Sequence, residues 1–432
     1  MKRKITDDLL RWKHKQHRRM PLLLYGARQV GKTYILRKFG NQNYKNVVYF
    51  NLETNKTVSS YFDENIEAVR IIRYLEAESG ERITPGDTLI ILDEIQSCER
   101  ALTSLKYFNE NTPEYHIIGA GSLLGVAINR EKYSYPVGNV DSMTLFPIDF
   151  EEFLWALDEQ RLCDLIKEAF EKNEALPQAL HEKALDIYRQ YLIIGGMPVA
   201  ILEYLETKSL LAVPDVLNRI ANDYIADMAK YATNADSVKI RAAYDSIPVQ
   251  LAKENKKFQY KLAQKGGTAT IFGAAIDWLC FAGTVLKCDR LEQAYMPISV
   301  YRDFSSFKLY MSDTGLLTMR SGISQHVILS AGSIENTFVG YISENYVAQA
   351  LACKRYGLFY WTNEGTAEID FLLQKDAEII PIEVKTGTRV RTKSLNIFTE
   401  KYKPAYSIRI SSKNFGFGNN IKSVPLYAVF CI

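Results

Sequence analysis

The sequence contains no long hydrophobic run and no paired cysteine spacing, and its first residues do not resemble a secretory signal. No stretch approaches about 18 consecutive apolar residues, so we expect no membrane-spanning helix. The six cysteines are scattered without CxxC spacing, which argues against a zinc site or a disulfide framework and predicts buried, reduced thiols. The N-terminus is basic but has no apolar core or small-residue cleavage site, so we expect a cytoplasmic protein.

An excess of charge is also lacking, because the formal net charge of the 432 residues is only +3. Overall charge therefore does not predict nucleic-acid binding, which would have to come from local patches. The densest basic patch spans residues 2–19, either as a solvated helix face or as a surface that follows phosphates. A chain of this length exceeds what one hydrophobic core usually supports, so we expect roughly two to four domains.

A glycine-rich loop near the N-terminus has the pattern of a phosphate-binding site. The apolar run at residues 21–25 is typical of a buried parallel strand, and the loop GARQVGKT follows it and leads into a helical segment. The two glycines of such a loop allow backbone N–H groups and the helix N-terminus to face an anion. Lys32 would reach the β and γ phosphates, and the Thr33 hydroxyl would bind Mg²⁺. The predicted ATP-binding residues are Gly26, Ala27, Arg28, Gln29, Val30, Gly31, Lys32, Thr33 and Tyr34.

A second apolar strand, TLIILDE at residues 88–94, ends in two carboxylates, as in a Walker B segment. Asp93 would hold the magnesium ion through water, and Glu94 would orient and polarise the attacking water. Considered alone, this run is equally a strand that ends in solvated acids. Its pairing with the glycine-rich loop predicts ATP hydrolysis, with Lys32 and Glu94 as the catalytic residues.

Three further segments, residues 46–53, 115–119 and 143–147, are predicted to be neighbouring strands. Asn51 could contact Glu94 or be a surface amide. Ser122 follows another strand end and is our candidate for sensing the γ-phosphate, or for capping the next helix. Asp149 and Glu152 have the spacing of a capping box.

These motifs resemble prokaryotic ATPases of the AAA superfamily that carry an uncharacterised C-terminal domain of restriction-endonuclease type. The resemblance covers essentially the whole chain and depends on LLLYGARQVGKT, LIILDEIQ, GAGSLLG, LFPIDFEEFL, YLIIGGMPVA, FKLYMSDTGLL, EIDFLL and PIEVKTG. Many members have Gly-Arg before the fifth strand, where this chain has Gly138-Asn139, so no arginine finger is implied there. Arg130 or an arginine of another subunit could replace it, and hydrolysis would be slow without a partner.

The middle of the chain is predicted to be helical at residues 165–228, with a break at Gly195 and Gly196. The resemblance implies that this region is a lid that closes over the nucleotide. A helix at 236–253, a glycine turn, a helix at 268–281 and strands at 284–288 and 307–311 then suggest a winged helix. Its candidate DNA contacts are Lys253, Lys256, Lys257, Lys261, Lys265 and Thr268. The second helix is so apolar that a protein-interaction or hinge module is the alternative.

The C-terminal region places charged residues inside apolar strands. Because strand side chains alternate, Glu368 and Asp370 should share one face, as should Glu383 and Lys385. Such charges are costly unless they meet a partner, and a divalent metal held by Glu344, Asp370 and Glu383 is the natural candidate. Lys385 would position water or stabilise the transition state. The spacing matches the PD-(D/E)xK nuclease pattern; the alternative is a solvated hairpin face with a Glu383–Lys385 ion pair.

The sequence thus predicts an α/β protein in which a P-loop ATPase core with a parallel sheet (residues 1–164) precedes a helical lid (165–232). A winged-helix-like region (233–330) and a nuclease-like α/β domain (331–432) follow. The leading function is ATP turnover coupled to binding or cleavage of nucleic acid, most naturally DNA. The alternative is a slow nucleotide-controlled switch that binds a protein or nucleic-acid partner without cutting it. Expected cofactors are ATP and Mg²⁺, and a homo-oligomer or protein partner is compatible with both functions.

Overall fold

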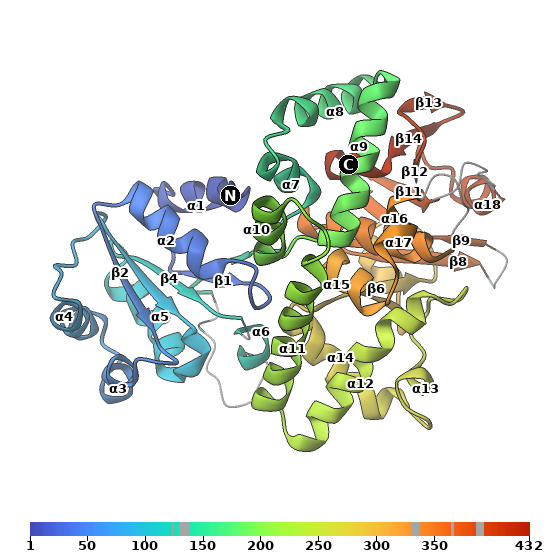
Figure 1. The fold of residues 1–432 in the computed structure, drawn as a ribbon. Helices are drawn as coiled ribbons and strands as arrows, with labels where there is room; N and C mark the ends of the chain where they lie inside the picture. Colours follow the sequence, from blue (N-terminus) through green and yellow to red (C-terminus); the bar gives the residue numbers. More distant parts are fainter. Residues whose placement is uncertain (123, 129–135, 137, 331–336, 364–366, 386–392) are drawn as a thin grey trace. The chain divides into compact units, whose positions relative to one another are not determined.

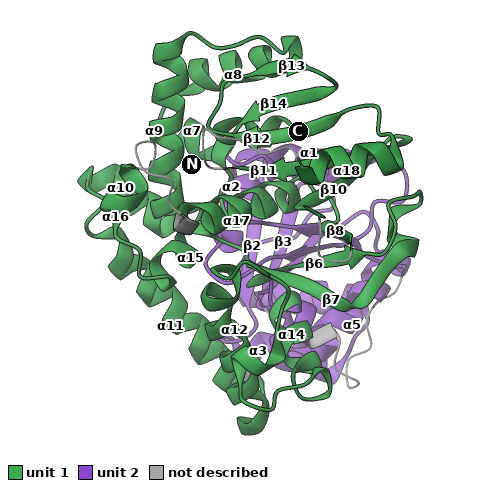
Figure 2. Ribbon diagram, turned by 90° about the vertical axis from the view of Figure 1, so that its right-hand side faces the viewer, with its two compact units in different colours: residues 1, 147–280, 284–432 green, residues 2–146, 281–283 purple. Residues whose placement is uncertain are grey.

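The protein is described by a computed structural model that covers residues 1–122, 124–128, 136, 138–330, 337–363, 367–385 and 393–432. The chain divides into two compact units (Figure 2). The smaller unit contains residues 2–146 and 281–283, and the larger contains residue 1 with residues 147–280 and 284–432. The finer boundaries expected after residues 164, 232 and 330 stay predictions.

The smaller unit contains a five-stranded parallel sheet with the strand order β2-β3-β4-β1-β5. Strands β1, β2 and β4 of this sheet are labelled in Figure 1. The strands are β1 (Leu22–Tyr25), β2 (Asn46–Asn51), β3 (Thr88–Asp93), β4 (His116–Ala120) and β5 (Asp141–Thr144). All five predicted strands are confirmed, although β5 starts and ends earlier than the predicted range 143–147. Since β4 lies between β1 and β3, the carboxyl ends of all three strands meet at one edge of the sheet.

Both faces of this sheet are covered by helices. Side chains of α3 (Lys56–Glu64), α4 (Ala68–Ser79) and α5 (Glu99–Asn111) form one buried apolar cluster with alternate residues of β3, among them Ile90 and Leu92. On the other face α2 (Lys32–Asn43) contacts β2 and β3, and α1 (Ile5–Lys13) contacts α2. Burial on both faces explains why the strands appear in the sequence as continuous apolar runs. The short elements η1 (Ile95–Ser97) and α6 (Leu124–Ile128) follow β3 and β4.

The larger unit begins with helices. They are α7 (Phe150–Ala156), α8 (Gln160–Lys172), α9 (Gln178–Ile194), α10 (Pro198–Thr207), α11 (Val213–Tyr231), α12 (Asn234–Leu251), α13 (Tyr260–Ala263) and α14 (Ala269–Phe281). The capping box is confirmed, because Glu152 N–H donates to Asp149 (2.9 Å) and Asp149 N–H donates to Glu152 (3.3 Å). The helix break is confirmed at Gly195, whose φ of 73° suits glycine.

A hairpin follows the helices of the larger unit, as predicted. Strands β6 (Val285–Leu291) and β7 (Arg302–Met311), with η2 (Ile298–Tyr301) between them, pair antiparallel. On its other edge β6 pairs in parallel with β8 (Phe359–Asn363), which pairs with β9 (Ala367–Ile369). The hairpin is therefore part of a four-stranded sheet rather than a free wing. The name winged helix stays a prediction.

The second sheet of this unit is mixed, with the order β10-β11-β12-β14-β13. Its strands are β10 (Phe371–Lys375), β11 (Glu378–Val384), β12 (Ser407–Ser411), β13 (Gly416–Gly418) and β14 (Ile421–Pro425). The remaining helices are α15 (Thr314–Arg320), α16 (Gln325–Leu329), α17 (Thr337–Cys353), α18 (Lys393–Tyr402) and η3 (Leu426–Cys431). The predicted strand through Asp370 is interrupted there, because β9 and β10 belong to different sheets. The α/β class is confirmed, and the restriction-endonuclease-like fold stays a prediction.

The six cysteines are free thiols, as predicted, although only Cys98, Cys163 and Cys288 are buried and the others are half-buried. Burial raises the pKa of the Cys163 thiol to about 11 and, with Glu151 nearby, keeps it protonated. Within the ranges described, none of the helices combines the length and the apolar character that crossing a bilayer requires.

A buried carboxyl group connects two motifs of the larger unit. Asp313 is fully buried at the start of α15, and it accepts N–H groups from Gly196 (2.5 Å) and Leu316 (2.9 Å). A Cβ atom at Gly195 would lie 2.4 Å from Asp313 Oδ1, so glycine is needed for this approach. Asp313 therefore joins the YLIIGGMPVA and SDTGLL segments.

Burial raises the pKa of Asp313 to about 6, against the N–H groups of Gly196, Leu316 and Gly315, which lower it. This value exceeds the pKa of about 4 for an unfolded aspartate, so folding favours the protonated form. That contribution is complete below about pH 4 and is lost as the pH rises through 6.

We expect the stability difference between wild type and Asp313→Asn to change by about 3 kcal/mol between pH 4 and pH 7, with wild type losing stability. Urea unfolding of both proteins at several pH values measures this change. Equal pH dependence of the two proteins would contradict the burial argument.

Candidate nucleotide site and a charged C-terminal cluster

The glycine-rich loop joins β1 to α2 at the carboxyl edge of the parallel sheet. Gly31 caps α2 with a φ of 94°, and Gln29 has a φ of 65°. At Gly26 a Cβ atom would lie 2.3 Å from the Leu145 carbonyl oxygen, so only glycine fits. The loop therefore has the backbone geometry needed to bring the N-terminus of α2 against an anion.

Lys32 is folded over this loop. Its side chain is buried, and Nζ donates to the carbonyl oxygens of Gly26 and Ala27, at 2.9 Å each. Backbone carbonyls are weaker partners for an ammonium group than phosphate oxygens. The position of Lys32 suits the predicted contact with the β and γ phosphates.

The two predicted magnesium ligands of the smaller unit are in direct contact. Thr33 Oγ1 donates to Asp93 Oδ2 at 2.6 Å, and the Tyr49 hydroxyl donates to the same oxygen at 2.9 Å. Burial, with the charge of Asp93 beside it, raises the pKa of Tyr49 to about 12, so Tyr49 stays a donor. A hydroxyl and a carboxylate suit Mg²⁺, whose remaining positions phosphate and water fill in such sites.

Glu94 lies beside this pair in a strained conformation. Its φ of 50° is left-handed, which is uncommon for a residue with a side chain and is typical of functional positions. Gln96 Nε2 donates to Glu94 Oε2 at 2.5 Å, and Ser122 Oγ lies 3.5 Å from the same oxygen. The structure therefore brings the predicted Glu94 and Ser122 together. Asn51 instead accepts the N–H groups of its own turn, at residues 53 and 54.

Gln96 and Tyr49 are the residues that the sequence reasoning missed. Gln96 is buried, and a Cβ atom at Gly121 would lie 1.9 Å from its side-chain oxygen, so Gly121 makes room for it. The available signal was the position of Gln96, two residues after Glu94 in LIILDEIQ. Tyr49 gave a weaker signal, as a polar side chain in the strand next to β3.

The remaining predicted loop residues differ in burial. Ala27 and Val30 are buried, Gln29 is half-buried, and Arg28 is exposed. Tyr34 is 57% exposed on the first turn of α2, where its ring is open to a nucleotide base or to solvent.

The position that lacks an arginine finger has a structural role. Asn139 Oδ1 accepts a hydrogen bond from Asn109 Nδ2 at 2.9 Å, and Gly138 has a φ of 75°. Arg130, the predicted substitute, lies outside the described residues.

Several basic side chains of the N-terminal patch are used inside the smaller unit. Arg3 is buried and donates to the carbonyl oxygens of Val30 (3.0 Å) and Phe146 (2.6 Å). Lys15 pairs with Asp141 at 2.9 Å. Arg3 thereby supports the glycine-rich loop from behind, and these contacts favour the structural interpretation of residues 2–19.

In the larger unit, Glu344 of α17 is the centre of a buried charged cluster. Its Oε1 accepts from the Tyr310 hydroxyl (2.5 Å) and Lys308 Nζ (3.1 Å), and its Oε2 pairs with Lys256. Burial alone would raise the pKa of Glu344, but Lys256 and Lys308 hold it well below its usual range. Glu344 is therefore ionised and surrounded by donors.

The other predicted C-terminal residues lie around the same cluster. Asp370 accepts the Val384 N–H at 2.8 Å, and burial, with Glu344 nearby, raises its pKa to about 6 against the neighbouring lysines. Lys385 Nζ lies 3.3 Å from Glu383 Oε1. Although burial lowers the pKa of Lys385, Asp370 and Glu383 raise it above the usual value. The expected Glu383–Lys385 face is confirmed.

This arrangement does not fit a divalent metal as predicted. Both oxygens of Glu344 are engaged by ammonium and hydroxyl groups, and Lys308 also binds Glu368 at 2.5 Å. Across the described part of the chain, no group of three or more His, Cys, Asp or Glu side chains is placed to hold an ion. Lys256 also differs from expectation, because its ammonium group points to Glu344 instead of remaining available for a DNA phosphate.

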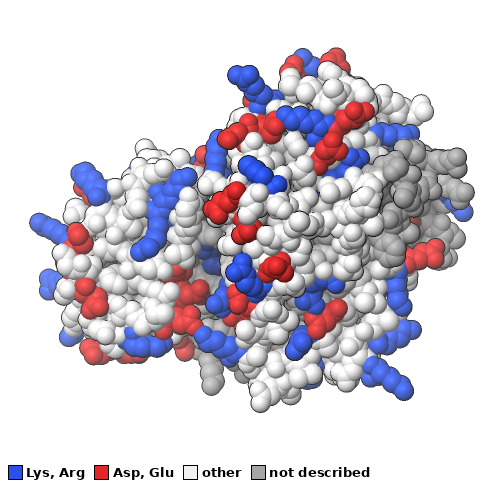
Figure 3. Space-filling model, viewed as in Figure 1, with Lys and Arg blue, Asp and Glu red and all other residues white. Residues whose placement is uncertain are grey.

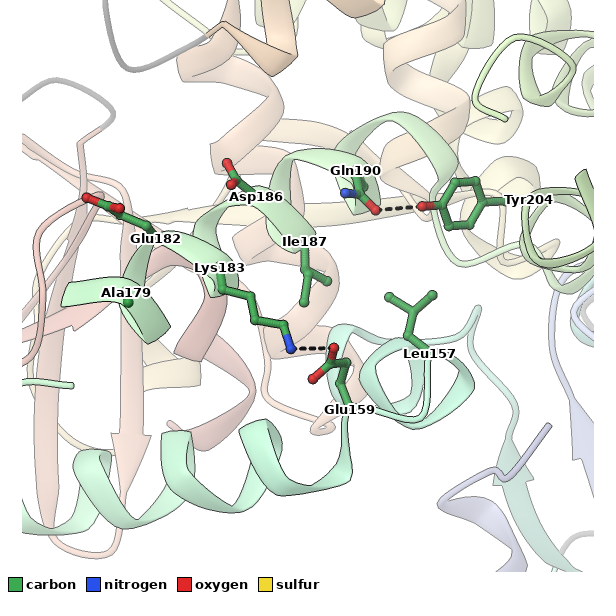
Figure 4. Close-up of a pocket in the computed structure, with 9 residues that line it drawn as sticks. All are labelled: Leu157, Glu159, Ala179, Glu182, Lys183, Asp186, Ile187, Gln190 and Tyr204. Atoms are coloured by element: carbon green, nitrogen blue, oxygen red, sulfur yellow. Dashed lines mark hydrogen bonds and ion pairs between the residues drawn. The ribbon is translucent and has the colours of Figure 1, made fainter. Parts of the chain in front are cut away.

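A separate open pocket of about 540 Å³ lies between α9, Tyr204 of α10 and the segment at Leu157 and Glu159 that follows α7 (Figure 4). Its polar lining is largely internally paired, with Lys183 and Glu159 2.6 Å apart and Tyr204 donating to Gln190 at 2.9 Å. On the molecular face in Figure 3, basic and acidic side chains are interspersed. Neither feature gives a second functional site.

Three family profiles match successive parts of the chain. A profile described as AAA domain matches residues 18–154, and two domains of unknown function, DUF8612 and DUF4143, match residues 185–327 and 339–429. A search of curated proteins found no match.

Among solved structures, a Walker-type ATPase of Pyrococcus abyssi is similar, with 16% sequence identity and a TM-score of 0.45. The match covers 74% of this chain and 95% of that chain. The ORC2 protein of Aeropyrum pernix, in ADPNP-ADP complexes, has 11% identity, coverage of 79% and 94%, and a TM-score of 0.40. The AAA match includes the glycine-rich loop, Asp93, Glu94 and Ser122, all of which meet at one edge of the parallel sheet. Residues 18–154 are an AAA-family P-loop ATPase domain.

Proposed function

We propose that the chain binds ATP at residues 26–34, hydrolyses it with magnesium, and uses turnover to control nucleic-acid binding by its C-terminal region. The observation that carries the ATPase part is the 2.6 Å contact between Thr33 and Asp93 beside Glu94. This contact supports the proposal that a P-loop hydroxyl and a Walker B carboxylate share one ion.

Each residue of the nucleotide site has a distinct role in this proposal. Lys32 exchanges the loop carbonyls for phosphate oxygens, and the amide groups of the loop bind the same phosphates. Thr33 and Asp93 would hold Mg²⁺, which neutralises charge on the leaving phosphate. Glu94 orients the attacking water, and Ser122 is placed to contact the γ-phosphate near Glu94.

The coupling to nucleic acid is supported by the region around α13. Lys253, Lys261 and Lys265 are exposed there, and the helix-turn-helix-hairpin order is present. The apolar side of α14, with Phe272 and Leu279, is buried, which leaves Thr268 at its exposed start. The exposed lysines suit phosphate contacts, although Ile271 of α14 is also 40% exposed.

The second candidate is a slow nucleotide-controlled switch that binds a partner without cutting it. The lysines bound to Glu344 favour this function, because metal-dependent cleavage through Asp370, Glu383 and Lys385 would need the carboxylates in a different arrangement. The missing arginine at Asn139 is consistent with slow turnover.

Lys32→Ala should weaken ATP binding by roughly 10- to 100-fold, since hydrogen bonds to charged groups contribute about 1.5–3 kcal/mol each. Titration with a fluorescent ATP analogue measures the affinity, and Lys38→Ala on the same helix is the matched control. Unchanged affinity in Lys32→Ala would contradict the assignment of the loop.

Gln96→Ala should lower kcat for ATP by about tenfold or more while KM stays within about twofold, because Gln96 orients Glu94 and is not placed to bind nucleotide. Steady-state phosphate release gives both constants, with the exposed Gln42→Ala as control. A rise in KM at unchanged kcat would show that Gln96 acts in nucleotide binding.

Wild type with ATP and Mg²⁺ should bind DNA or RNA from a broad panel with an affinity that changes between ATP and ADP, measured by fluorescence anisotropy. The triple variant Lys253→Ala/Lys261→Ala/Lys265→Ala should lose most of this binding and keep its ATPase activity. The same reactions on gels report cleavage. Cleavage that Asp370→Ala or Lys385→Ala removes would support the nuclease form of the prediction, and binding to no member of the panel would contradict the coupling.

A further inference from the structure

We infer that the ammonium group of Lys308 is the resident cation of the C-terminal carboxylate cluster, in the position that a divalent metal would otherwise fill. The cluster consists of Glu344, Glu368, Asp370, Glu383 and Lys385, with Lys256 and Lys308 as further cations. This inference does not depend on the proposed ATPase function, because it concerns residues of the larger unit alone.

Lys308 is enclosed on every side by groups that bind a cation. Its side chain on β7 is 1% exposed, and Nζ lies 2.5 Å from Glu368 Oε1 and 3.1 Å from Glu344 Oε1. The ring of Tyr360 lies with its centre 4.9 Å from the same nitrogen. A buried ammonium group is costly without such partners, so the cluster and Lys308 stabilise each other.

Glu344 would be the central metal ligand, but both of its carboxylate oxygens already accept hydrogen bonds. Oε1 takes the Tyr310 hydroxyl together with Lys308, and Oε2 takes Lys256. A divalent ion bound here would have to displace these donors and would stand beside a buried positive charge. Two of the three predicted metal ligands, Glu344 and Glu383, are therefore paired with lysines, and the third, Asp370, accepts the Val384 N–H.

The two lysines differ in how firmly they are held. Lys308 is in the middle of a strand and fully enclosed, whereas Lys256 follows α12 and its side chain is 22% exposed. Lys308 is therefore the permanent cation, and Lys256 is the second counter-ion of Glu344. Lys256 and Lys308 belong to the part of the larger unit before residue 327, and their partners Glu344 and Glu368 belong to the part after residue 336. These ion pairs therefore also connect two segments of the larger unit.

The test is a Mn²⁺ titration without nucleotide, monitored by electron paramagnetic resonance, in a Thr33→Ala/Asp93→Ala background that removes the proposed metal ligands of the P-loop site. With Lys308 present, we expect no Mn²⁺ site tighter than about 1 mM, the weak end of protein sites for divalent cations. A site tighter by tenfold or more that Glu344→Gln or Asp370→Asn removes would overturn the inference.

A variant that removes the charge of Lys308 should instead gain a Mn²⁺ site. Lys308→Met keeps the length of the side chain and removes the cation, so the carboxylates should gain a Mn²⁺ site that an added Glu344→Gln removes. Lys308→Arg, which keeps the charge, should gain none. A folded Lys308→Met protein without a new site would also overturn the inference. If Lys308→Met does not fold, the Mn²⁺ titration of the protein that retains Lys308 still tests the inference.

Discussion

The hydrogen bond between Thr33 and Asp93 is the central contact of the proposed nucleotide site, because it joins the start of α2 to the end of β3 across the carboxyl edge of the sheet. Two strands that are not adjacent thereby present their functional side chains at one point, with β4 and Ser122 between them. The packing around this contact is tight: Gly26 touches the chain after β5, and Gly121 makes room for Gln96. Loop, Walker B strand and sensor position thus form a single assembly.

The C-terminal cluster also contains buried carboxylates, but there they are balanced by lysine side chains. Carboxylates in a buried sheet need cations, which a metal or lysine side chains can supply. Here Lys308 and Lys256 supply them for Glu344, and Lys308 also pairs with Glu368. The pattern of acids that resembles a nuclease is therefore compatible with a binding module, and the difference depends on two lysines outside the pattern itself.

The sequence predicted those features that are local in the chain. The loop, the Walker B strand, the capping box at Asp149 and the break at Gly195 each follow from a few consecutive residues. The partners of Glu94 and Glu344 were not predicted, since they depend on which distant strands become neighbours. Lys308 lies inside the apolar run FKLYM, which indicates that it is buried and needs a partner. That partner, Glu344, is 36 residues away in the chain and could not be identified from the sequence. Likewise, the separation of Glu368 on β9 from the strand after Asp370, β10, depends on how the two sheets assemble.

The central claim is that the Thr33–Asp93 pair and Glu94 make the AAA domain a magnesium-dependent ATPase. The most direct measurement is phosphate release from ATP by wild type and Glu94→Gln, each with Mg²⁺ and with excess chelator. We predict release by wild type with Mg²⁺ alone, and a loss of about 100-fold or more in Glu94→Gln while ATP binding is retained. Release that persists in chelator, or equal rates in the two proteins, would contradict this account.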